Sequence, residues 1–184
     1  NLLGFTVTPS QLQVANPVLI LTLIPLFSYG LLPLASRFFR VTPMGKVTTG
    51  FVLAATSFAV AALIESRIQD GHAPSVAWQL LAYVFLTAGE VLVSVTCLEY
   101  AYTQSPKSMK SFIMSIFLAS VAVGNLWTAL VIKFGANTLQ GARYYWFFTG
   151  TMLVTTIAFA FVSRFYKEAD YIIDEAHVAP PPNE

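Results

Sequence analysis

Glu90 is the residue of this sequence with the clearest capacity for chemistry, because its carboxyl group lies in the middle of a long apolar segment. The segment runs from Trp78 to Leu98, and at about 1.5 Å per residue Glu90 lies roughly 18 Å along a helix that must cross about 30 Å of hydrocarbon. An ionised carboxylate facing lipid at that depth costs several kcal/mol, so such a residue normally faces a bundle interior, a water-filled cavity or a cation. The position therefore predicts a substrate or ion pathway.

The other residues offer little further chemistry. One Cys and two His leave no cluster that could hold a metal ion. An enzyme that used Glu90 as a general acid or base would need a second titrating or metal-binding group within reach, and no other apolar segment supplies one. We therefore expect no catalytic residue, no metal and no bound cofactor. The alternative for Glu90 is a structural role, as a buried and protonated carboxyl group.

The composition is that of a membrane protein with an all-α fold. Of the 184 residues, 56% are hydrophobic and 10% are charged, against roughly 25% charged in soluble domains. The net charge of +1 gives no indication of a nucleic-acid partner. The five expected transmembrane helices span residues 9–35, 46–64, 78–102, 111–132 and 144–165. Prolines at positions 17, 25 and 33 should bend the first of these helices without breaking it.

Residues 1–166 are expected to form one helical bundle, and residues 167–184, which are polar and include three consecutive prolines, a partly disordered cytoplasmic tail. The odd number of spans and the absence of an initiating Met suggest a piece of a longer protein. If the loop after the first helix faces the cytoplasm, the inner segments hold Arg37, Arg40, Lys46, Lys107, Lys110, Arg164 and Lys167, and the outer ones hold Arg67, Lys133 and Arg143. This asymmetry predicts an outside N-terminus and a cytoplasmic C-terminus, in the plasma membrane.

The segment around Glu90 closely resembles the tenth-helix signature of the proton-coupled oligopeptide transporters, a family of the major facilitator superfamily. The matching positions are Gly89, Glu90, Val91, Ser94, Thr96, Leu98, Glu99, Tyr100, Tyr102, Gln104, Pro106, Met109, Lys110 and Ser111. Ser105 replaces the usual Ala. The positions Gln13, Asn16, Pro17, Ile20 and Pro25 resemble the pattern of the family's eighth helix, and Val121 to Asn125 resemble its eleventh. The resemblance implies that the chain holds helices eight to twelve, a partial C-terminal bundle.

The resemblance also implies roles for individual residues. Glu90 would engage the α-ammonium group of a peptide, with Asn16 as its partner across the cleft and Ser94 lining the same cavity. Leu98 would belong to the cytoplasmic gate, and Phe117 stands where relatives usually carry a substrate-lining Trp. Each has a plainer alternative: Asn16 as a helix cap before Pro17, Ser94 bonded to its own backbone, and Leu98 and Phe117 as packing residues.

The function that the resemblance implies is symport of di- and tripeptides with protons, by alternating access. The proton would be the coupling ion, and the partners would be peptides, the lipid bilayer and the missing N-terminal half of the transporter. Alternatives are another major facilitator carrier, for nitrate, an amino acid or a drug, or a non-catalytic structural membrane subunit. A nitrate carrier would need a cation in its cavity, whereas every Lys and Arg here falls near the end of an expected helix.

Overall fold

The computed structural model describes residues 9–38, 42–72, 74–103, 105, 107–135 and 138–165. Within these residues the regular structure is helical, and five helices are long and apolar enough to cross a membrane. The all-α fold class expected from the sequence is confirmed. The expected tail, residues 167–184, lies outside the described residues.

The first membrane span is built around its prolines. Helix α1 (Pro9–Pro25) continues into a π-helical turn, η1 (Leu26–Leu31), and then into α2 (Leu32–Phe38). Pro25 has no N–H to donate, so the α-helical bonding pattern is interrupted there. Beyond Pro25, the N–H of Leu32 bonds to the carbonyl of Phe27, five residues back, which is the π-helical spacing. The chain thus stays helical through all three prolines.

Helix α3 (Pro43–Gln69) is longer at both ends than the expected span of residues 46–64. At its start, the side chain of Thr42 accepts a hydrogen bond from the backbone N–H of Gly45 at 3.1 Å, and Pro43 occupies the first helical position, where its missing N–H costs nothing. At its end, Gly71 adopts φ +80° just beyond the cap residue Asp70. Local capping therefore extends the helix beyond its apolar stretch.

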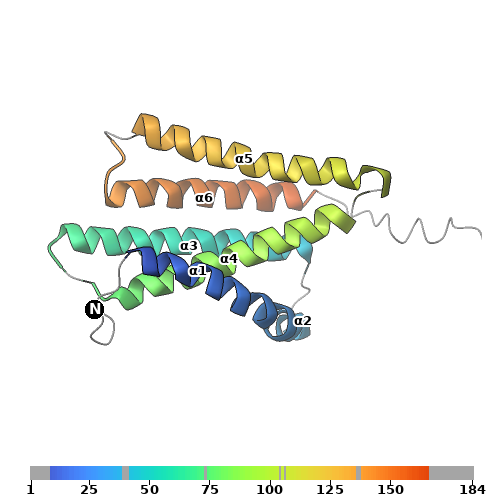
Figure 1. Cartoon of the computed structure of the whole chain (residues 1–184), viewed down its shortest axis with the longest axis horizontal. Coiled ribbons are helices and arrows are strands. Elements are labelled where there is room, and N and C mark those ends of the chain that lie inside the picture. Colours follow the sequence, from blue (N-terminus) through green and yellow to red (C-terminus); the bar gives the residue numbers. More distant parts are fainter. Residues whose placement is uncertain are drawn as a thin grey trace, which may run out of the picture.

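The remaining spans are α4 (Val76–Thr103), α5 (Lys110–Gly135) and α6 (Ala142–Ser163), with a single 3₁₀ turn, η2 (Lys107–Met109), before α5. Helix α3 packs extensively against both α4 and α6, and α1 crosses α4 (Figure 1). The α1–α4 contact includes a small apolar cluster of Leu23, Ala88 and Val91. Helix α5 packs only lightly on α4, and none of its most apolar stretch is buried.

Two glycines allow α3 and α4 to come close. A Cβ atom on Gly89 would lie 2.6 Å from the carbonyl oxygen of Gly50, and one on Gly50 would lie 2.9 Å from the carbonyl oxygen of Gly89. Neither position has room for a side chain. Small residues at a helix crossing are a common basis of association in membranes, since they let two backbones touch.

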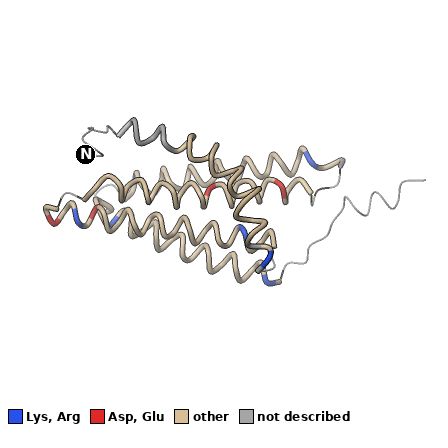
Figure 2. The backbone as a smooth tube through the Cα atoms, turned by 90° about the horizontal axis from the view of Figure 1, so that it is seen from below, with Lys and Arg blue, Asp and Glu red and all other residues tan. Residues whose placement is uncertain are grey.

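The described Lys and Arg residues lie near the helix ends (Figure 2). Arg67 and Lys133 lie in the last turns of α3 and α5, and Arg143 lies in the first turn of α6. These three share one end of the bundle with the α3–α4 loop, which we call the loop end (Figure 1). The opposite end includes Arg37 and Lys110, at the end of α2 and the start of α5.

Candidate functional site

Helix α4 has one buried and one exposed face, and Glu90 lies on the exposed one. Glu90 is the fifteenth of the 28 residues of α4, close to its midpoint. Ser94 and Leu98 follow at intervals of four residues, so the three side chains lie along one stripe, and all three are exposed. The buried residues of the helix are Ala82, Thr87, Ala88, Gly89, Val91, Leu92 and Thr96.

Within the described part of the chain, neither Glu90 nor Ser94 has a hydrogen-bond or ion-pair partner. The structure therefore does not show Glu90 as a carboxyl group buried in a helix contact, and it does not show Ser94 bonded to its own backbone. Both side chains present polar groups that a ligand could contact. A carboxylate accepts hydrogen bonds and attracts a cation, whereas a hydroxyl group both donates and accepts.

The structure brings Asn16 to the turn of α4 that precedes Glu90. The hydroxyl group of Thr87 donates to the side-chain oxygen of Asn16 at 2.6 Å, and it also lies 2.8 Å from the carbonyl oxygen of Tyr83. Thr87 is 0% exposed and Asn16 is half-buried. Because α1 begins at Pro9, Asn16 lies inside the helix and is not its cap. Thr87, which sequence reasoning missed, is thus the residue that holds Asn16 against α4.

Leu98 and Phe117 are placed differently. Leu98 is 42% exposed on the Glu90 stripe, two turns farther from the loop end. Phe117 lies half-buried on α5, where its carbonyl accepts a hydrogen bond from Ser120. Since α5 packs only lightly on α4, the structure does not gather Phe117 into one compact group with Glu90 and Asn16.

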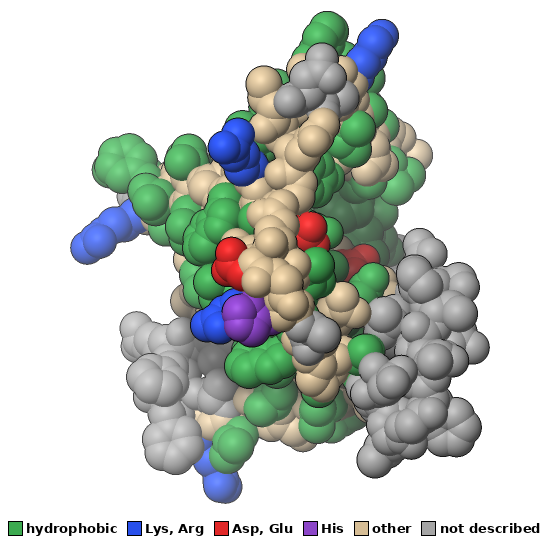
Figure 3. Space-filling model, turned by 90° about the vertical axis from the view of Figure 1, so that its left-hand side faces the viewer, with side chains coloured by type: hydrophobic (Ala, Val, Ile, Leu, Met, Phe, Trp, Pro, Cys, Tyr) green, Lys and Arg blue, Asp and Glu red, His purple; other side chains and the backbone are tan. Residues whose placement is uncertain are grey.

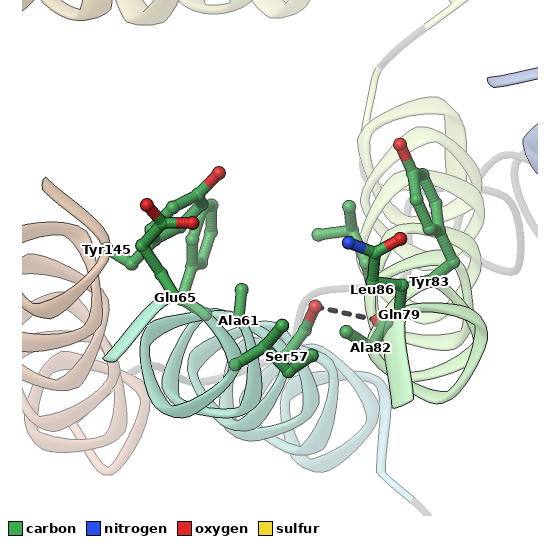
Figure 4. Close-up of a pocket in the computed structure, with 10 residues that line it drawn as sticks. Ser57, Ala61, Glu65, Gln79, Ala82, Tyr83, Leu86 and Tyr145 are labelled. Carbon is green, nitrogen blue, oxygen red and sulfur yellow. Dashed lines mark hydrogen bonds between the residues drawn. The ribbon is translucent and has the colours of Figure 1, made fainter. Parts of the chain in front are cut away.

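A second polar group, absent from the sequence analysis, lines an open pocket of about 380 Å³ between α3, α4 and α6. Glu65 and Tyr145 lie on one side of this pocket, and Gln79 and Tyr83 lie on the other (Figure 4). At its floor, Ser57 donates a hydrogen bond to the carbonyl of Ala82 at 2.7 Å. In the sequence, only Glu65 could have indicated this polar group, because it is an acidic residue close to the end of an apolar segment.

Among the residues that the structure describes, no group of three or more His, Cys, Asp or Glu side chains could hold a metal ion. The polar atoms of the Glu90 stripe and of Asn16 suit a small organic ligand that carries a positive charge. This arrangement can therefore bind a ligand through several polar contacts at once.

The chain is similar to known transporters. A family model described as PTR2, POT family, matches residues 1–147. Peptide transporter PTR2 of Saccharomyces cerevisiae is 32% identical over 160 residues, which cover 80% of this chain and 26% of that protein. Solute carrier family 15 member 2 of Homo sapiens is 40% identical over 102 residues, which cover 54% of this chain and 14% of that protein.

A solved structure agrees with these relatives. The crystal structure of an autoinhibited POT family peptide transporter matches with a TM-score of 0.80 and 33% identity, over 95% of this chain and 35% of that one. The chain thus spans about a quarter of the yeast relative and about a third of the solved transporter. The family resemblance seen around Glu90 is confirmed, because the family model matches most of the sequence. The chain belongs to the POT family.

Proposed function

We propose that this chain forms the C-terminal helices of a transporter that carries di- and tripeptides, together with protons, across a membrane by alternating access. The observation that carries the proposal is Glu90, a carboxyl group at mid-helix that is exposed and has no partner among the described residues. The names of the relatives, which are peptide transporters, support peptides as the substrates.

In this proposal Glu90 and Asn16 bind the α-ammonium group of the peptide. Thr87 donates to the Asn16 side-chain oxygen and holds it beside this turn of α4. An amide oxygen has two lone pairs, so this oxygen can accept a second hydrogen bond, from the ammonium group. Ser94 lines the same cavity, and Phe117, which lies apart from Glu90 and Asn16 in this structure, would supply an aromatic wall from α5 in the complete transporter.

Transport requires that the ligand bind the outward-open and inward-open states with different affinity, because equal affinity shifts no equilibrium. A carboxylate at the interface between the two halves of the transporter meets this requirement, since its interaction with the ammonium group changes when a proton neutralises the carboxylate. Leu98 lies two turns beyond Glu90 on the same stripe and would close the cytoplasmic gate by packing against the N-terminal half of the transporter.

We place the chain in the plasma membrane with its N-terminus outside and its C-terminus in the cytoplasm, as the basic residues indicate. The proton serves as the coupling ion, no other cofactor takes part, and no reaction is catalysed. An anion carrier is disfavoured because the described Lys and Arg residues lie near helix ends, away from Glu90 (Figure 2).

Glu90→Gln in the complete transporter tests the proposal. The substitution removes the charge and nearly preserves the shape, so the loss of one charge-assisted contact should cost about 1.5–3 kcal/mol, or roughly 10- to 150-fold in affinity. A peptide with an acetylated amino terminus never makes this contact and should lose much less. The measurement is the ratio of the dissociation constants of one dipeptide in its free and acetylated forms, in both proteins.

Glu99→Gln is the matched control. Glu99 is also exposed on α4, but nine residues from Glu90 it lies about 180° around the helix. Its substitution should leave the ratio unchanged. If Glu90→Gln leaves the ratio unchanged in a well-folded sample, Glu90 does not bind the ammonium group.

A further inference from the structure

A second open pocket, of about 510 Å³, lies at the loop end against the last three turns of α3. Arg67 lines this pocket, whereas Glu65 lines the pocket of Figure 4. Two residues apart, these side chains leave α3 about 200° from each other. The final turns of α3 therefore separate their charges, with the acidic side chain facing α6 and the basic one facing the second pocket.

The lining of the second pocket changes from apolar to basic along α3. Val60 and Leu63 line the part of the pocket farther from the α3–α4 loop, and Leu63 is 56% exposed. Arg67 lies seven residues beyond Val60, or about 10 Å nearer the end of the helix. Trp78, 55% exposed in the first turn of α4, forms the facing wall. A ligand that fits this pocket is apolar at one end and negatively charged at the other.

The α3–α4 turn supplies a second basic group. The backbone N–H of His72 donates to the carbonyl of Arg67 at 3.0 Å, and that of Gly71 donates to the carbonyl of Ile68 at 3.0 Å. Gly71 has φ +80°, a conformation that glycine adopts at little cost. The turn is thus held in a shape that places His72 beside Arg67, and both side chains are exposed. On this end of the molecule, basic and histidine side chains adjoin hydrophobic ones (Figure 3).

We propose that this pocket binds a membrane phospholipid, with its phosphate group between Arg67 and His72 and an acyl chain against Leu63 and Trp78. The guanidinium group of Arg forms paired hydrogen bonds with phosphate oxygens. A Trp side chain at a helix end lies at the level of the lipid headgroups. Asp70 belongs to the same turn but does not line the pocket. The proposal depends on this pocket alone and not on peptide transport.

The test measures binding of dioleoyl phosphatidylglycerol to the complete protein in detergent, by native mass spectrometry. The double variant Arg67→Gln, His72→Gln should raise the dissociation constant of one bound lipid roughly tenfold, as loss of charge-assisted contacts at an exposed site predicts. The control is Arg143→Gln, which removes an exposed charge from the same end and should leave this lipid bound as in the wild type.

Two further arms identify the ligand and guard against misfolding. Glycerophosphoglycerol, the same headgroup without acyl chains, should not displace the lipid at equal concentration, and displacement would overturn the proposal in favour of a site for free phosphate esters. Trp78→Ala removes the apolar wall without altering either basic residue and should weaken lipid binding several-fold. If the double variant and Trp78→Ala both bind lipid as the Arg143→Gln control does, the pocket is not a phospholipid site.

Discussion

Side-chain hydroxyl groups act in two ways among these helices. Most described Ser and Thr residues donate to a carbonyl of their own helix, one turn back, as Thr56 does to Val52 at 2.8 Å. Ser57 differs, because its hydroxyl is buried and donates across the helix contact to Ala82 of α4 at 2.7 Å. These two neighbours in the sequence thus have different roles: the Ser57 hydroxyl joins α3 to α4, whereas the Thr56 hydroxyl bonds within α3.

Ser57→Ala should therefore lower the stability of the protein. Interhelical hydrogen bonds in membrane proteins contribute on average about 0.6 kcal/mol and at most about 1.7 kcal/mol, so the melting temperature should fall by a few degrees. Thr56→Val is the control, because Thr56 is exposed and its hydrogen bond stays within α3. Thermal unfolding in detergent, followed by tryptophan fluorescence, measures both variants. Equal melting temperatures would mean that the Ser57 bond adds nothing.

Residue spacing could predict part of the candidate site. Glu90, Ser94 and Leu98 share a face because of the helical period alone, and the sequence is sufficient for that. The contact between Asn16 and Thr87 joins residues 71 positions apart and depends on how α1 crosses α4. No local pattern contains that information, so the sequence indicated Asn16 only through a family resemblance and did not indicate Thr87.

At the scale of the elements, apolar length predicted the spans, but local chemistry fixed their ends. Thr42 and Pro43 start α3 before its apolar stretch begins. The prolines of the first span predicted a bend, yet the π-helical turn over Leu26–Leu31 depends on which carbonyls the remaining N–H groups reach. The pocket of Figure 4 needs three helices at once, and a single-helix pattern could not reveal it.

The glycine contact between α3 and α4 makes a prediction at this scale. Gly89→Ala places a methyl group 2.6 Å from the Gly50 carbonyl oxygen, so the helices must separate, at a cost of about 1–3 kcal/mol. Gly50→Ala should behave alike. Gly150→Ala is the control, because nothing lies within 4 Å of its added Cβ atom. The measurement is the yield of monodisperse protein and its melting temperature, and an unchanged Gly89→Ala protein would contradict the close contact.

For the whole molecule, the two ends of the bundle differ in their basic residues, and this makes a topological prediction. In a Cys97→Ser background, single cysteines at Asp70 and Ser108, both exposed and at opposite ends of α4, should react with a membrane-impermeant maleimide from opposite sides. Asp70→Cys should react from outside, because positively charged loops remain in the cytoplasm. Reaction of both from the same side would contradict a single crossing by α4.

The touching backbones of Gly50 and Gly89 also have a mechanical consequence. Gly89 directly precedes Glu90 in α4, and α3, which Gly89 touches, is itself packed along α6. In the alternating-access cycle proposed above, a tilt of α4 that moves Glu90 would displace α3 at the Gly50 contact, and α3 would in turn displace α6, which packs along it. Helices that contribute no side chain to the Glu90 stripe would in this way move together with it.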